Sequence, residues 1–90
     1  MVKFDAIEWD DPDRPLGNVR HVGEHGLTPD DVEHVLRSPH GSDGFSRSSG
    51  RPIRFGWTSG GRHIAVVYKV KQGRTLTTIR PITAFPVDPH

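Results

Sequence analysis

The 90-residue chain contains no cysteine, which excludes disulfide bonds, thiolate nucleophiles and thiolate metal sites. Apolar residues make up only 32% of the sequence, so the core of a single domain over residues 1–90 is expected to be thin. No apolar run approaches the ~20 residues that a membrane-spanning helix needs. No charged and then apolar leader opens the chain, so we expect a cytoplasmic protein without a signal peptide or a membrane partner.

Acidic residues are scarce in the second half of the chain. Nine of the eleven carboxylates precede Ser38, and only Asp43 and Asp88 follow it. The later basic residues are Arg47, Arg51, Arg54, Arg62, Lys69, Lys71, Arg74 and Arg80. This asymmetry predicts an anionic partner for the second half of the chain. The alternative is a solvated sheet on which Lys and Arg prevent edge-to-edge pairing.

Three runs rich in β-branched and aromatic residues occupy the C-terminal third, at 53–58, 63–70 and 75–84. Short connectors that contain glycine separate them, and glycine supplies the positive φ of a tight hairpin. The sequence therefore predicts an antiparallel meander. The middle run is apolar at consecutive positions, which is typical of a central strand buried on both faces.

The N-terminal half is expected to cover or extend this sheet. Residues 2–9 alternate loosely and predict a short edge strand. Asn18 is a good N-cap for a first short helix, which Gly26 ends in the left-handed conformation. A second helix is expected over 28–36, where Thr28 caps and an apolar stripe recurs at i, i+3 and i+4.

Together these patterns predict an α+β fold with two short N-terminal helices packed on a three- to four-stranded antiparallel sheet. The helices need an apolar surface, and the sheet is the only candidate. Residues 40–52, rich in Ser and Gly, are interpreted as a flexible loop. Residues 86–90 are interpreted as a frayed tail.

Several of these segments carry a family resemblance. The segments are IEWD at 7–10, then Asn18, His25-Gly26-Leu27, the helix at 28–36, and GWTSGGRHIAVVY at 56–68. In this order they resemble the BrnT family of the RelE/ParE superfamily of bacterial toxins. The resemblance implies a RelE/ParE-like fold and an endoribonuclease that cleaves RNA, in particular mRNA on the ribosome, without metal or cofactor. It also implies a cognate antitoxin as inhibitor, in a homodimer or a toxin–antitoxin hetero-oligomer.

A metal-independent ribonuclease must move two protons and stabilise the charge that develops on phosphorus. Arginine suits the charge, and His or Tyr suits the proton transfers. The candidate catalytic residues are Arg62, Arg80, Arg51, His25 and Tyr68. We expect the three arginines to lie in one concavity on the sheet face that the helices leave open.

The candidate RNA-binding residues are Arg54, Lys69 and Trp57. Each candidate also has a structural interpretation: a surface arginine with its stem over apolar neighbours, or an aromatic ring in the core. His63 opens the central strand and is a weaker candidate for the general base. His21 and His25 have the i, i+4 spacing of metal ligands, but no third ligand motif accompanies them, so no metal site is expected.

Two other functions stay open. The first is a catalytically inactive RelE-like fold that binds nucleic acid or protein through its basic sheet. The second is a small structural or immunity-type protein whose acidic helices form the working surface.

Overall fold

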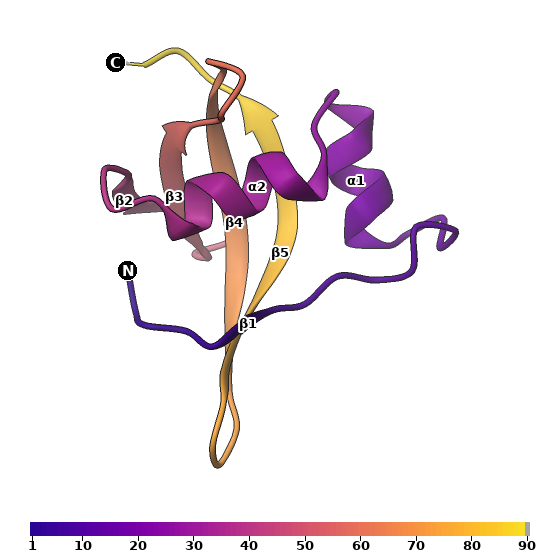
Figure 1. Ribbon diagram of the computed structural model, residues 1–90, viewed down its shortest axis with the longest axis vertical. Helices are drawn as coiled ribbons and strands as arrows, with labels where there is room; N and C mark the ends of the chain where they lie inside the picture. The colour runs from indigo at the N-terminus through magenta and orange to yellow at the C-terminus, as the bar shows by residue number, and fades with distance from the viewer. Residues whose placement is uncertain (90) are drawn as a thin grey trace.

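The computed structural model describes residues 1–89 as a five-stranded sheet with two helices packed on one of its faces (Figure 1). The strands lie side by side in the order β1-β5-β4-β3-β2. The elements are β1 (Ala6–Ile7), α1 (Asn18–Glu24), α2 (Pro29–Arg37), β2 (Ser42–Phe45), β3 (Pro52–Trp57), β4 (His63–Gln72) and β5 (Thr77–Pro86). Because α1 contacts β5 while α2 contacts β3 and β4, the two helices together cover one face.

The predicted meander is confirmed and is longer than expected. Four antiparallel strands, β2 to β5, follow one another through the sheet. The N-terminal run supplies an edge partner, but β1 has only two residues and runs parallel to β5. A parallel pairing is available because the whole segment from α1 to β4 separates the two strands. The α+β class with two helices is therefore correct, whereas the sheet is mixed and five-stranded.

The central position of β4 explains its consecutive apolar residues. Ile64 and Val66 face the helices and are fully buried. Ala65 and Val67 face the opposite side, where they pack in a separate cluster. Since successive side chains of a strand alternate between faces, a strand that is covered on both sides reads as a continuous apolar run.

The second helix begins and ends close to where the sequence predicts. Thr28 Oγ1 accepts a hydrogen bond from the Asp31 backbone N–H at 3.2 Å, and the Asp31 carboxylate accepts one from the Thr28 N–H at 3.0 Å. This reciprocal pair is a capping box. Val35 packs closely over β3, because a Cβ at Gly56 would lie 3.1 Å from Val35 Cγ1. Neither helix within residues 1–89 is long and apolar enough to cross a membrane.

The first helix corrects one expectation. Gly17, not Asn18, is its N-cap and has no side chain to cap the helix, and the Asn18 N–H donates to Asp10 Oδ2 at 3.0 Å. Asn18 is 1% exposed, and its side-chain amide donates to the carbonyls of Glu8 at 3.0 Å and Pro81 at 2.8 Å. Its Oδ1 accepts from the Asp10 N–H at 2.9 Å. Asn18 therefore ties α1 to both the β1 segment and β5, since a buried amide must satisfy its polar atoms.

Residues 40–52 do not form the flexible loop that composition predicts, because they contain β2 and the first residue of β3. The strand forms because the outer edge of β3 offers unpaired backbone groups, and the Asp43–Arg54 ion pair fixes its register. The predicted tail is also partly ordered. Pro86 ends β5, and the Val87 N–H donates to the His63 carbonyl at 3.0 Å. His90 lies outside the described residues.

Candidate nucleic-acid interface on the open face of the sheet

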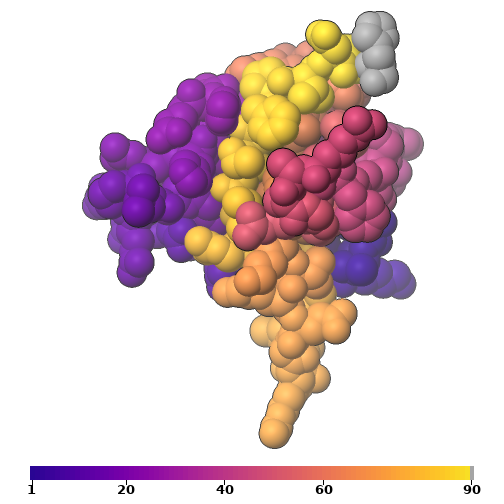
Figure 2. All heavy atoms as spheres, turned by 180° about the vertical axis from the view of Figure 1, so that it is seen from behind, coloured from indigo at the N-terminus to yellow at the C-terminus, as the bar shows by residue number. Residues whose placement is uncertain are grey.

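The face of the sheet opposite the helices, here called the open face, carries its own apolar cluster. Figure 2 shows this side, with β5 and the β4–β5 hairpin in yellow and orange and α1 only at the margin. Three of the cluster residues are buried and four are partly exposed. They are Ile53, Ala65 and Val67, surrounded by Phe55, Ile82, Phe85 and Val87. No helix within residues 1–89 packs on this cluster.

Aromatic rings gather at one end of the open face, where β3 and β4 meet their hairpin. Trp57 lies opposite His63, and the ring centroids are 4.9 Å apart with the planes tilted by 57°. Trp57 is 54% exposed. The His25 ring approaches the edge of Phe85, with centroids 6.1 Å apart. The rings of Trp57 and Phe85 thus frame a surface on which flat ligands can stack.

Basic residues occupy the other end of the open face. Lys69 and Arg80 are cross-strand partners on β4 and β5. Arg51 immediately precedes β3, in phase with Ile53, and is exposed. Neither Lys69 nor Arg51 forms an ion pair with the part of the chain that the structure describes. Their charges are therefore available to an anionic ligand.

Arg80 is held by two carboxylates from the N-terminal half. Its Nη2 lies 2.7 Å from Asp10 Oδ2, and its Nη1 lies 3.0 Å from Asp10 Oδ1 and 3.2 Å from Glu8 Oε1. The hydrogen bonds from Arg80 lower the pKa of Asp10 to about 2. Lys71 donates to Glu8 at 2.9 Å, and this bond lowers the pKa of Glu8. The acidic half of the sequence thus neutralises part of the basic sheet.

The three predicted catalytic arginines do not share one concavity. The Arg62 guanidinium donates to the carbonyl of Gly26 at 2.8 Å and approaches that of His25 at 3.5 Å, so it caps the C-terminal end of α1. Arg80 lies opposite Lys69 on β4. Lys69 follows Arg62 by seven residues, which is about 23 Å along an extended strand. Arg62 also lies before the first residue of β4, and its side chain is directed to the end of α1. The expectation is wrong because the distance along the strand separates Arg62 from the other two arginines.

Tyr68 and Arg54 also lie away from the open face. Tyr68 is 4% exposed in the core beneath the helices, and burial raises its pKa. The Arg54 side chain is 9% exposed, and it donates to Asp43 Oδ2 at 2.9 Å and to the Ser38 carbonyl at 2.6 Å. Both residues occupy even positions of their strands, and those positions face the helices. Neither side chain therefore lies on the open face, where the sequence places the RNA contacts.

Of the predicted site residues, the structure brings together two groups. The Arg62 guanidinium approaches the His25 carbonyl, and the His25 ring approaches Phe85 at the aromatic end of the open face. Arg80 and Lys69 meet at the basic end, near the start of β3. Within residues 1–89, no three His, Asp or Glu side chains are close enough to hold a metal ion.

Three residues that contribute to the open face were not predicted from the sequence. Phe85 was assigned no role, although its place at the end of the last apolar run predicts a position on the sheet. Glu8 and Asp10 were counted only as part of the acidic half. Their pairing with Arg80 and Lys71 depends on the β1–β5 contact, which no local sequence signal encodes.

The comparisons with known proteins add no family to this description. The chain matches no protein-family model, and a search of curated proteins finds no relative.

Proposed function

We propose that this protein binds single-stranded RNA across the open face of its sheet. The observation that carries the proposal is the order of groups along this face: exposed rings at one end, and at the other cations that form no ion pair with residues 1–89. His63 and Lys69 mark the two ends on β4, six residues or about 20 Å apart. A short segment of a single strand fits this length.

The two ends have complementary tasks in such a complex. Trp57 offers a π-face for a base, and stacking of this kind is worth about 1–3 kcal/mol per base and tolerates any sequence. Lys69 and Arg51 neutralise phosphates, which supplies sequence-independent affinity that falls as salt rises. A duplex keeps its bases stacked inside, so the ring surface favours a single strand.

The test is a fluorescence anisotropy titration of a labelled oligouridylate with the wild-type protein and two variants. Trp57→Ala is expected to weaken binding by about 10-fold or more, because one stacked base is lost. Leu76→Ala is the matched control, since Leu76 is 55% exposed, close to the 54% of Trp57, but lies at the β4–β5 hairpin. Equal effects of the two substitutions, or no binding by the wild type, would contradict the proposal.

A second candidate function is the metal-independent endoribonuclease of a toxin–antitoxin pair, with a RelE/ParE-like fold and a cognate antitoxin as its partner. The contact of Arg62, the residue before His63, with the His25 carbonyl favours it. In this arrangement one imidazole takes the proton of the ribose 2′-OH while the other protonates the leaving oxygen. The Arg62 guanidinium has further N–H groups beyond those that cap α1, and these can stabilise the extra charge on the phosphate.

The cleavage candidate is tested by incubating RNA with the protein in the presence of EDTA. His63→Ala and His25→Ala should each lower the cleavage rate by about 10²-fold or more. His34→Ala, an exposed histidine of α2, is the control and should cleave like the wild type. If His63→Ala and His25→Ala cleaved RNA as fast as the His34→Ala control, neither imidazole would take part in cleavage.

A further inference from the structure

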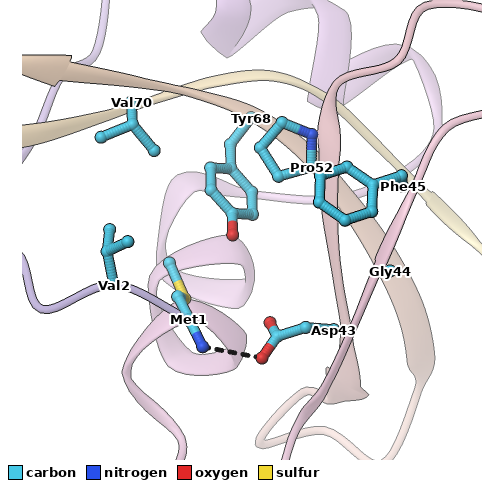
Figure 3. A pocket seen from close by; sticks show the side chains of 8 residues that line it. All are labelled: Met1, Val2, Asp43, Gly44, Phe45, Pro52, Tyr68 and Val70. Carbon is cyan, nitrogen blue, oxygen red and sulfur yellow. Dashed lines mark hydrogen bonds and ion pairs between the residues drawn. The ribbon is translucent and has the colours of Figure 1, made fainter.

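A pocket of about 600 Å³ opens on the helix side of the sheet, at the β2 edge, well away from the open face (Figure 3). Its volume lies within the range of small-molecule sites, about 300–1,000 Å³. We call it the β2 pocket. It is lined by Met1, Val2, Asp43, Gly44, Phe45, Pro52, Tyr68 and Val70.

The walls of the β2 pocket are mainly rings and aliphatic groups. Tyr68, Pro52 and Phe45 come from three neighbouring strands and lie along one side, and Val70 and Val2 lie across from them (Figure 3). The Phe45 ring is 75% exposed, so in the free protein it leaves much of its surface in water. A flat apolar ligand that entered the pocket would remove this surface from water.

Two polar atoms that have no hydrogen-bond partner within residues 1–89, Asp43 Oδ1 and the Tyr68 hydroxyl oxygen, face the same hollow. Asp43 Oδ2 accepts hydrogen bonds from Arg54 Nη1 at 2.9 Å and from the Met1 nitrogen at 2.8 Å. Asp43 Oδ1 accepts none from residues 1–89, and the Tyr68 hydroxyl forms none with any residue in the described part of the chain. Figure 3 shows this hydroxyl and the carboxylate directed to the same space. The pocket therefore offers one acceptor and one hydroxyl in apolar surroundings.

The turn between β2 and β3 adds cations beside the pocket. Ser46 and Arg51 close this turn, through an N–H to carbonyl hydrogen bond of 2.8 Å. Arg47 and Arg51 are exposed, and neither forms an ion pair with the residues that the structure describes. Arg51 also stands between the two surfaces: Pro52 on its C-terminal side lines the pocket, and Ile53 lies on the open face. A polyanion can thus reach the pocket from the open face past Arg51.

We propose that the β2 pocket binds a guanine base of the RNA. The inference rests on the proposed RNA binding and names the base that accompanies it. Guanine presents two adjacent donors, N1–H and the 2-amino group, next to the O6 acceptor. Asp43 Oδ1 accepts from the donors, the Tyr68 hydroxyl donates to O6, and the rings of Phe45 and Tyr68 pack against the base. Uracil, adenine and cytosine each present one donor beside one acceptor on this edge, so they can pair with both groups, but they lack the second donor that the guanine 2-amino group offers to Asp43.

The first test uses mononucleotides and the full chain in NMR titrations. Guanosine 5′-monophosphate should shift the amide signals of Gly44, Phe45 and Val70, and adenosine, cytidine and uridine monophosphates should bind at least about 10-fold more weakly. Inosine monophosphate, which lacks the 2-amino group, should bind about 10-fold more weakly than the guanosine form, as expected for one hydrogen bond to a charged acceptor. Equal affinities for all five nucleotides would overturn the guanine pocket.

The second test compares an oligouridylate with the same oligomer carrying one central guanosine. The wild type should bind the guanosine oligomer about 10-fold more tightly. Phe45→Ala and Tyr68→Phe should remove this preference and leave oligouridylate binding unchanged. Both variants are expected to fold, because the Phe45 ring is exposed and phenylalanine keeps the ring of Tyr68. Trp57→Ala should weaken both oligomers equally and keep the preference.

The outcomes separate the two proposals. Binding of oligouridylate with no preference for guanosine would overturn the pocket and leave the RNA-binding function standing. Binding of guanosine monophosphate at Phe45 without binding of either oligomer would support the pocket and overturn the proposed function. Binding of neither the nucleotide nor the oligomers would overturn both.

Discussion

The two faces of the sheet differ in how they cover their small aliphatic side chains. On the helix face, Ile64, Val66 and Ile79 are completely buried beneath α1 and α2. On the open face, Ala65 and Val67 are covered only by the side chains of neighbouring strands, such as Phe55, which stay partly exposed. The helix face therefore forms a core between the sheet and the helices, whereas the open face carries a single layer of apolar side chains.

This difference assigns separate tasks to the two faces. Complete burial yields most of the hydrophobic stabilisation, which places the stability of the fold on the helix face. The partly exposed rings of the open face keep apolar area that a ligand can cover. Substitutions at matched positions on β4 and its neighbours can test this division between stability and binding.

The largest effect is expected from adjacent valines on opposite faces. Val66→Ala should lower the free energy of unfolding by about 2–3 kcal/mol, because two methyl groups are lost from a site that cannot relax. Val67→Ala should cost only about 1 kcal/mol, since its neighbours can close over the gap. Urea unfolding of the two variants measures both values. Equal losses would mean that the open face carries as much of the core as the helix face.

A loss of about 2 kcal/mol is expected for Asn18→Ala. The substitution leaves the Pro81 and Glu8 carbonyls and the Asp10 N–H without their partner, at a place where α1 meets the sheet. Arg20→Ala, on the exposed side of α1, serves as the control. Thermal unfolding that shows the same midpoint for both variants would remove Asn18 from the stabilising contacts.

The acid response should depend on Asp10. Because Arg80 lowers the folded-state pKa of Asp10 to about 2 from 3.8, the contribution of this pair to stability is complete above about pH 4 and disappears as the pH falls through 2. Asp10→Asn should therefore be less stable than the wild type at pH 7, and the difference should shrink as the pH falls and vanish only well below pH 2. Asp88→Asn, in the exposed tail, should follow the wild type throughout. A difference that does not shrink between pH 5 and well below pH 2 would show that the contribution does not come from ionised Asp10.

The smallest effect on stability, and a clear effect on binding, is expected at Lys69. Lys69→Ala should weaken oligouridylate binding several-fold and reduce the slope of log K against log salt by about 0.7, the value for one phosphate contact on a single strand. Arg20→Ala, a cation on α1, should leave the slope unchanged. The same change in slope from both variants would describe a diffuse electrostatic surface in place of a site on the open face.

Much of the fold could be predicted from local signals. The continuous apolar run identified β4 as the central strand, and the Thr28 capping box identified the start of α2. The strand β2 was missed because Ser42, Asp43 and Gly44 have little β-propensity. Its pairing comes from the open edge of β3, which is a property of the assembled sheet.

The site could be predicted only in part, because phase alone does not place a side chain. Arg80 and Lys69 share the open face as strand periodicity indicates, but Arg62 lies beside α1 because the carbonyls at the helix end attract its guanidinium. An irregularity in the β4–β5 register at Val67 and Tyr68 shifts the pairing by one residue on β5. Glu8 and Asp10 also contact Arg80, and Glu8 is separated from Arg80 by 72 positions in the sequence. Such contacts follow from topology and not from local pattern.

The claim that the two faces have separate tasks is tested most directly by methyl NMR during a titration with oligouridylate. Val67 and Ile82 carry methyl groups on the open face, and Val66 and Ile79 carry them on the helix face. We expect the methyl signals of Val67 and Ile82 to move in proportion to bound RNA while those of Val66 and Ile79 stay in place. If the Val66 and Ile79 signals moved while those of Val67 and Ile82 stayed in place, the assignment of RNA binding to the open face would be contradicted.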